Sequence, residues 1–187
     1  MLRLNDIQMQ LKSIGDAKFQ KLCDQIMMML GYRPHKFTGS VVGKDKTRPG
    51  TPDSVYFDEN GEYIYVEMTT QENDLEKKIE DDFKKCVLKI SKFESLHNKI
   101  SKIIFFHNNI NIEENELEDI RMKYNNIKLE VYGIEFLSNL LQCKFPEIAK
   151  NELGLRDDYE TISQIPDREI ERISKLIFKE KKTNDTI

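Results

Sequence analysis

TPDSVYFDENGEYIYVEMT, residues 51–69, contains two short β-strand patterns on either side of a turn sequence. Runs of β-branched and aromatic residues predict the strands at residues 54–58 and 62–69. Asp53 stands at the start of the first strand, and Glu67 stands near the end of the second. The way these two strands pair therefore decides whether the two carboxylates meet.

The turn Glu59-Asn60-Gly61 leaves two registers open. A two-residue Asn-Gly turn would pair Asp53 with Met68 and would place Asp53 on the sheet face opposite Glu67. A three-residue loop with Gly61 in the left-handed conformation would pair Asp53 directly with Glu67. We expect the second register, because it forms one site from both carboxylates. That register also predicts the pairs Val55 with Tyr65 and Phe57 with Tyr63.

The composition is that of a highly charged globular chain. Of its 187 residues, 39% are hydrophobic and 33% are charged. No apolar run approaches the roughly 18 residues that a membrane span needs, and no secretory signal pattern opens the chain, so we expect a cytoplasmic protein with no membrane partner. The net charge of −4 argues weakly against a protein that coats DNA, but an enzyme that holds nucleic acid in one groove remains compatible with it.

The isolated cysteines and histidines indicate no metal site of their own. Cys23, Cys86 and Cys143 lack paired metal-binding spacing, and we expect them to be buried thiols in a reducing compartment. The histidines are expected at the surface or at helix caps. They are His35, His97 and His107.

Helical and strand patterns alternate along most of the chain. A helical stretch is predicted over residues 4–30 with a break at Gly15, and an irregular or β segment over 36–42. The later elements are predicted in the order helix 74–96, strand 102–106, helix 113–124, strand 127–132 and helix 134–141. Alternation of strand and helix favours parallel pairing on that side of the sheet. We therefore predict an α/β fold in three layers, with a central mixed β-sheet flanked by helices.

The chain changes character at about residue 156. Residues 1–155 are predicted to form one domain. Residues 156–187 are predicted to form a C-terminal helical tail, in which Pro166-Asp167 resembles a helix start. The tail is interpreted either as a linker to a further domain or as a dimerisation segment, and the sequence leaves both open.

Asp53 and Glu67 supply hard oxygen ligands of the kind that Mg²⁺ prefers. Hydrolysis of a phosphodiester needs a metal that polarises the phosphate and activates a water, together with a cation near the developing charge. Basic residues gather before Asp53, and we expect them to contact the phosphates of a nucleic acid. They are Arg33, Lys36, Lys44, Lys46 and Arg48.

The ordered set of motifs resembles the PD-(D/E)xK nuclease superfamily, which has the restriction-endonuclease-like fold. The resemblance covers roughly residues 15–155 and rests on four segments: Phe19-Gln20-Lys21-Leu22-Cys23, Gly31-Tyr32, Pro52-Asp53 and Glu67-Met68-Thr69. It implies that Asp53, Glu67 and the backbone carbonyl of Met68 bind Mg²⁺ or Mn²⁺. Gln20 stands where the family often has a supporting acid.

Thr69 departs from the family pattern, which usually has a catalytic lysine two residues after the glutamate. Three explanations stay open. A lysine from the next helix reaches the site, with Lys78 the first choice and Lys85 the second; or a second metal ion or a basic group such as Lys46 or Arg48 substitutes; or the site binds nucleic acid without cutting it. Thr69 itself is expected to line the catalytic pocket. The other expected pocket residues are Gln71, Asp82 and Lys85.

The string Glu67-Met68-Thr69-Thr70-Gln71, followed by Lys78 and Asp82, resembles a subgroup of bacterial anti-phage defence proteins. In that subgroup, a nuclease-like domain precedes larger sensor modules. The resemblance implies a Mg²⁺-dependent endodeoxyribonuclease that acts in antiviral defence, with RNA not excluded as the substrate. Cutting of both strands implies a homodimer or a higher homo-oligomer. The alternative is a catalytically inactive nuclease-like fold that binds nucleic acid or assembles partners.

Overall fold

The computed structural model describes residues 2–37, 40–41, 44–47, 51–91, 100–110, 112–124 and 127–156. Of the two groupings that the chain forms, Arg3–Leu155 is one compact unit and contains every element discussed below. The other grouping joins Met1–Leu2 to Arg156–Ile187, and the predicted tail helix in it lies outside the described residues. Among the described residues, no helix is both long enough and apolar enough to cross a bilayer.

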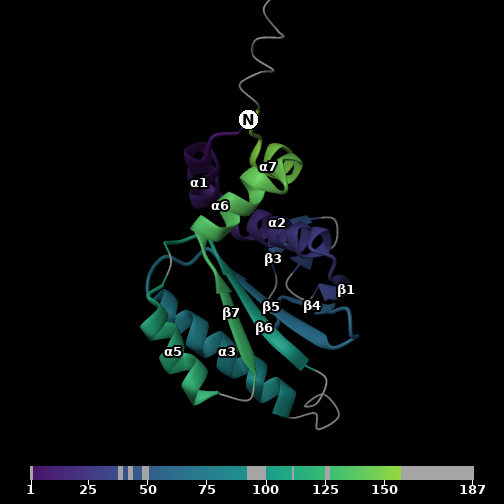
Figure 1. The fold of residues 1–187 in the computed structure, drawn as a ribbon, viewed down its shortest axis with the longest axis vertical. Helices are drawn as coiled ribbons and strands as arrows, with labels where there is room; N and C mark the ends of the chain where they lie inside the picture. Colours follow the sequence, from purple (N-terminus) through teal and green to yellow (C-terminus); the bar gives the residue numbers. More distant parts are fainter. Residues whose placement is uncertain are drawn as a thin grey trace, which may run out of the picture. The chain divides into compact units, whose positions relative to one another are not determined.

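Five strands form a mixed sheet in the order β1-β4-β5-β6-β7 (Figure 1). The antiparallel part consists of β1 (Arg33–Phe37), β4 (Ser54–Phe57) and β5 (Tyr63–Thr69). β6 (Ile100–His107) and β7 (Lys128–Tyr132) continue the sheet in parallel from β5. The predicted change to parallel pairing is confirmed. It follows from the helices that connect these strands, since a crossover returns the chain to the same end of the sheet.

Two features near β1 differ from the expectation. β1 begins at Arg33, earlier than the segment predicted over 36–42. A separate two-stranded sheet of β2 (Ser40–Val41) and β3 (Lys44–Thr47) was not predicted. Its strands are short and polar, so they carry no periodic apolar signal.

The hairpin between β4 and β5 adopts the register in which the carboxylates meet. Val55 pairs with Tyr65 and Phe57 pairs with Tyr63, as predicted. The N–H of Asp58 donates to the carbonyl of Glu62 at 2.9 Å and closes a three-residue loop. Gly61 has φ +80°, the left-handed conformation that this loop requires. One further step along the same register brings Asp53 level with Glu67.

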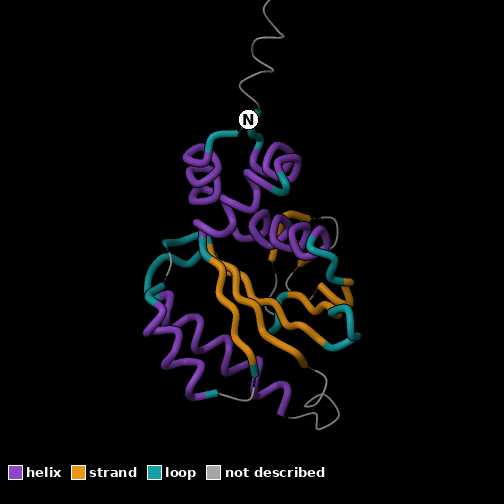
Figure 2. The backbone as a smooth tube through the Cα atoms, in the orientation of Figure 1, coloured by secondary structure: helices purple, strands orange, loops and turns teal. Residues whose placement is uncertain are grey.

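The helices of the described chain are shown in Figure 2 as purple segments. They are α1 (Leu4–Ser13), α2 (Asp16–Met29), α3 (Leu75–Ser91), α5 (Glu114–Lys123), α6 (Ile134–Cys143) and α7 (Pro146–Leu153). The predicted break at Gly15 is confirmed, since this residue is the N-cap of α2. α7 was not predicted. It is short, with Pro146 in its first turn and Gly154 at φ +67° after its last residue, which are ordinary start and stop signals.

Alternate side chains of the strands bury opposite faces of the sheet. Val55, Tyr65, Ile103, Phe105 and Leu129 form one core cluster with residues of α3 and α5. These two helices run side by side along that face (Figure 1). On the other face, the buried Tyr56 reaches α2, and Ile64, Val66, Ile104 and Phe106 are buried on the same side. The described unit is therefore an α/β structure with helices on both faces of its sheet.

Two surface expectations are wrong. His107 is 1% exposed, because β6 is a central strand covered on both faces. Its Nδ1 accepts the N–H of Asn109 at 3.3 Å, and burial lowers its pKa to about 4, so the ring is neutral. Cys143 is exposed at the end of α6, whereas Cys23 and Cys86 are buried as expected.

Substitution of Gly61 by alanine tests the hairpin loop. We expect Gly61→Ala to lose about 1 kcal/mol of stability, or about 2–4 °C in Tm, because a side chain at positive φ is strained. Asn60→Ala is the matched control, since Asn60 is exposed in the same loop and does not have a positive φ. Thermal unfolding of both variants measures the effect, and equal losses would contradict it.

Candidate active site

A cavity of about 570 Å³ lies where β5 ends, between the first turns of α2 and the side of α3. It brings together residues from four separate segments of the chain. The sequence-predicted residues that line it are Gln20, Asp53, Glu67, Met68, Thr69, Gln71, Lys78, Asp82 and Lys85. The hairpin register positions the two carboxyl groups, and the helices on either side supply the remainder.

Asp53 and Glu67 are in direct contact. Asp53 Oδ2 accepts the N–H of Met68 at 2.9 Å, and the two carboxyl groups hydrogen-bond each other. Burial, followed by the charge of Asp53, raises the pKa of Glu67 to about 9. Burial also raises the pKa of Asp53. At neutral pH, Glu67 therefore keeps its proton and donates it to the Asp53 carboxylate, so the pair carries one negative charge.

Cys86 on α3 also contacts Glu67. Its Sγ lies 3.2 Å from Glu67 Oε1 and donates a hydrogen bond, and both side chains are buried. The contact fixes the orientation of the Glu67 carboxyl group. The sequence predicts only that Cys86 is a buried thiol, because its partner Glu67 comes from a separate strand.

Lys78, Asp82 and Lys85 form a charged group on the side of α3 that faces the cavity. Lys78 Nζ lies 2.7 Å from Asp82 Oδ2, and Lys85 Nζ lies 2.7 Å from Asp82 Oδ1. The spacing of four and three residues places all three on one helix face. Asp82 is buried, whereas Lys85 is exposed over 57% of its side chain. The group has one more positive than negative charge, and the charge of Lys78 opposes the rise in the pKa of Asp53.

Thr69 supports the backbone after β5. Its Oγ1 accepts the N–H of Gln71 at 3.1 Å, and the carbonyl of Gln71 accepts Asn109 Nδ2 at 2.5 Å. Thr69 is 8% exposed and carries no charge. A positive charge that stabilises a bound anion would therefore come from another residue. In the described part of the chain, the lysines that line the cavity are Lys78 and Lys85.

Arg33 and Lys36, the two described side chains among the residues predicted to bind nucleic acid, do not line this cavity. Arg33 and Lys36 are exposed on β1, which is an edge strand of the sheet. The guanidinium of Arg33 lies 6.0 Å from the ring centre of Phe57. Lys44 and Lys46 belong to β3, but their side chains lie outside the described residues, as does the whole of Arg48.

Several residues at or behind the cavity were not predicted from the sequence. Asp16 and Thr70 line the cavity, and the Thr70 hydroxyl hydrogen-bonds the Asp16 carboxylate. Asp24 is buried on α2, behind the start of β4. The available signal for Asp24 was its position one helical turn after Gln20, which places both residues on one side of the helix.

The oxygen atoms around Asp53 fit a hard divalent cation. Within the described residues, no group of three or more His, Cys, Asp or Glu side chains is arranged to hold a metal ion. A site here therefore depends on the two carboxyl groups together with neutral oxygens. The Met68 N–H faces Asp53. Because the N–H and the carbonyl of one strand residue face the same neighbouring strand, the Met68 carbonyl faces the Asp53 side as well. With the Gln20 amide and water, these ligands match the preference of Mg²⁺ or Mn²⁺ for oxygen.

Comparison of the sequence with protein-family models finds no match, and comparison with curated proteins finds none either.

The raised pKa of Glu67 predicts that the metal-free protein loses stability as pH rises. An unfolded glutamate ionises near pH 4.5, whereas folded Glu67 keeps its proton up to about pH 9, so the folded state binds more protons in between. The contribution of the Glu67 proton to folding stability is complete below about pH 4.5, and it is lost as the pH rises toward about 9. Between about pH 6 and about pH 9, we expect Tm to fall more steeply for wild type than for Glu67→Gln, which cannot ionise. Circular dichroism melts measure the two slopes, and equal slopes would contradict the assignment.

Proposed function

We propose that this chain contains a metal-dependent endonuclease domain that hydrolyses DNA phosphodiester bonds, and that its α/β structure is of the restriction-endonuclease-like kind. The observation that carries the proposal is the contact between the Asp53 and Glu67 carboxyl groups in a cavity that Lys78 also lines. Carboxylates in contact and a cation beside them are the groups that phosphodiester hydrolysis needs.

Asp53, Glu67, the Met68 carbonyl and the Gln20 amide would hold Mg²⁺ or Mn²⁺. When bound, such an ion polarises the phosphate and lowers the pKa of a coordinated water. Glu67 gives up its proton on binding, because a ligand carboxyl group must be ionised. Cys86 keeps Glu67 Oε1 in place through its hydrogen bond.

Lys78 would stabilise the charge that develops on the phosphate. In the metal-free protein it pairs with Asp82, which also holds Lys85. Because Lys85 alone can neutralise Asp82, Lys78 can turn toward a phosphate without leaving a buried carboxylate unpaired. This arrangement supplies the cation that Thr69 cannot provide.

The preference for DNA over RNA, the role in antiviral defence, the homodimer or higher homo-oligomer, the further domains and the cytoplasmic location come from the family resemblance and are part of the proposal. Arg33 and Lys36 would contact phosphates beyond the cavity, at the exposed edge of the sheet. Cleavage assays with supercoiled plasmid and with RNA in parallel distinguish the two substrates.

A catalytically inactive nuclease-like fold that binds nucleic acid or assembles partners is the second candidate. The observations that favour it are the uncharged Thr69 and the pairing of both cavity lysines with Asp82. Under this alternative, the wild-type protein binds plasmid but does not nick it in Mg²⁺ or Mn²⁺.

Removal of one carboxylate tests the proposed metal site. We expect Asp53→Asn to reduce plasmid cleavage in Mn²⁺ by more than about 100-fold, because loss of a direct ligand costs more than loss of a residue that merely supports one. Asp119→Asn, an exposed carboxylate on α5, is the control and should keep the wild-type rate. Cleavage by Asp53→Asn at the wild-type rate would refute the proposal.

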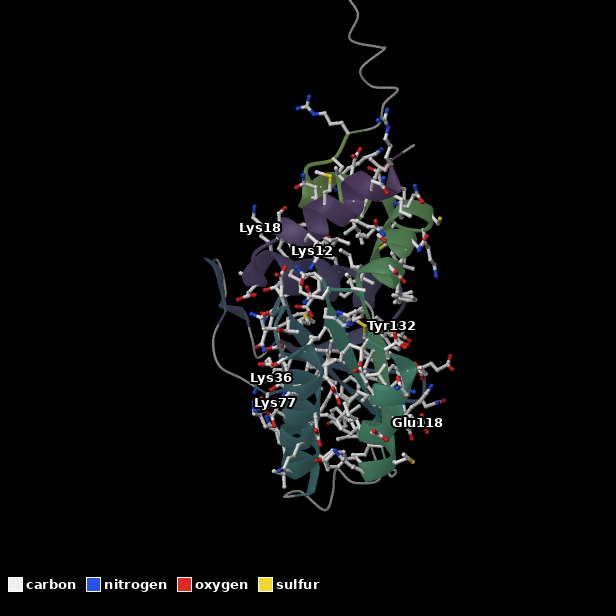
Figure 3. All side chains as sticks on the ribbon, turned by 90° about the vertical axis from the view of Figure 1, so that its left-hand side faces the viewer. Lys12, Lys18, Lys36, Lys77, Glu118 and Tyr132 are labelled. Atoms are coloured by element: carbon white, nitrogen blue, oxygen red, sulfur yellow. The ribbon has the colours of Figure 1, made fainter. Side chains whose placement is uncertain are left out.

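Removal of the cation tests the role of Lys78. We expect Lys78→Ala to lower the cleavage rate by about 100-fold while Mn²⁺ affinity changes little, because the ammonium acts on the phosphate. Lys77→Ala is the matched control. Lys77 is the preceding residue on α3, is exposed, and is labelled in Figure 3. If Lys85→Ala is the more damaging variant, the second lysine of the cavity has the role instead.

A further inference from the structure

Asp24 is a buried carboxylate that the proposed chemistry does not use. It lies on α2, one turn after Gln20, and is 8% exposed. Tyr56 Oη donates a hydrogen bond to Asp24 Oδ1 at 2.6 Å, and the Ser54 hydroxyl also hydrogen-bonds this carboxylate. Ser54 directly follows Asp53 in the chain. Asp24 therefore fixes the start of β4 to α2 at the residue beside the proposed metal ligand.

Within the described residues, the charge of Asp24 is poorly compensated. Burial and, less strongly, the charge of Asp53 raise the pKa of Asp24 to about 6, while the hydrogen bonds from Tyr56 and Ser54 oppose that rise. The neighbouring Cys23 thiol is neutral, because burial and the charges of Asp24 and Asp53 raise its pKa. No lysine or arginine of the described chain forms an ion pair with Asp24. A negative charge thus remains in the interior behind Asp53 at neutral pH and above.

We infer that Asp24 is a positioning residue of the proposed metal site, which holds Asp53 in place through Ser54 and Tyr56 and adds a buried negative charge that strengthens the binding of a divalent cation. The inference rests on the proposed function. Its physical basis is that a buried charge with no cation partner among the described residues destabilises the fold, whereas a cation bound at Asp53 interacts with it favourably.

Mn²⁺ alone is the probe. Calorimetric titration at about pH 8 compares wild type with Asp24→Asn, Tyr56→Phe, Asp53→Asn and the control Asp119→Asn. We expect Asp24→Asn to bind Mn²⁺ about tenfold more weakly, because it keeps the shape of the side chain but lacks the charge. Tyr56→Phe retains the Asp24 charge and should lose less Mn²⁺ affinity than Asp24→Asn. Asp53→Asn should lose the most Mn²⁺ affinity.

Stability separates this role from a merely structural one. In the absence of metal at about pH 8, Asp24→Asn should have a Tm equal to or above that of wild type, because a destabilising interior charge has been removed. A structural role would instead lower Tm, so reduced Tm or failure to fold overturns the inference.

The remaining outcomes are also decisive. If Asp53→Asn loses Mn²⁺ binding while Asp24→Asn matches wild type, the inference is wrong and the proposed function stands. Equal losses in Asp24→Asn and Tyr56→Phe contradict the role of the charge. If wild type binds no Mn²⁺, the proposed function fails and the inference fails with it.

Discussion

Two carboxyl groups in contact inside a protein repel each other unless a proton or a cation lies between them. The hairpin from β4 to β5 forces this contact on Asp53 and Glu67, because its register puts them level on one face of the sheet. The rest of the cavity is arranged around that constraint. The backbone N–H of Met68 and the thiol of Cys86 each donate to one of the two groups. A proton held by Glu67 removes the repulsion between the two groups.

The positive charges that line the cavity are paired with a carboxylate. Asp82 forms ion pairs with both Lys78 and Lys85, so α3 presents two ammonium groups to the cavity and each of them has a partner. Placed beside a carboxyl pair, this group gives the cavity both signs of charge within a small volume. A phosphodiester bound through a metal ion needs both signs of charge. The carboxylates bind the metal ion, and the ammonium groups neutralise the negative phosphate oxygens.

The parts of this structure that the sequence predicted are those set by local chemistry. Gly15 separated α1 from α2, and the alternation of strand and helix gave the parallel half of the sheet. The turn residues allowed two hairpin registers, and the expectation that both carboxylates form one site selected the register that the structure has. Lys78 and Asp82 were placed in the pocket from a resemblance and from helical spacing. The restriction-endonuclease-like assignment remains a proposal.

The missed features depend on contacts between distant segments. Nothing local distinguishes the Cys86 thiol from other buried cysteines until Glu67 of β5 is packed against it. Asp24 is one acid among many on a charged chain, and only the folded position of Tyr56 shows that it is buried. His107 looked isolated along the chain because burial of a central strand is a property of the whole sheet.

The segment that follows β5 is tied to other parts of the fold. Asn109 after β6 donates to the carbonyl of Gln71, and Lys12 of α1 bonds both Asn109 Oδ1, at 2.7 Å, and Glu72. These polar links connect the rim of the cavity to the N-terminal helix. Undocking of α1 would break both Lys12 bonds together, so a local opening of the N-terminal helix also removes support from the segment beside Gln71. Amide exchange around Gln71 thus reports how firmly α1 is docked.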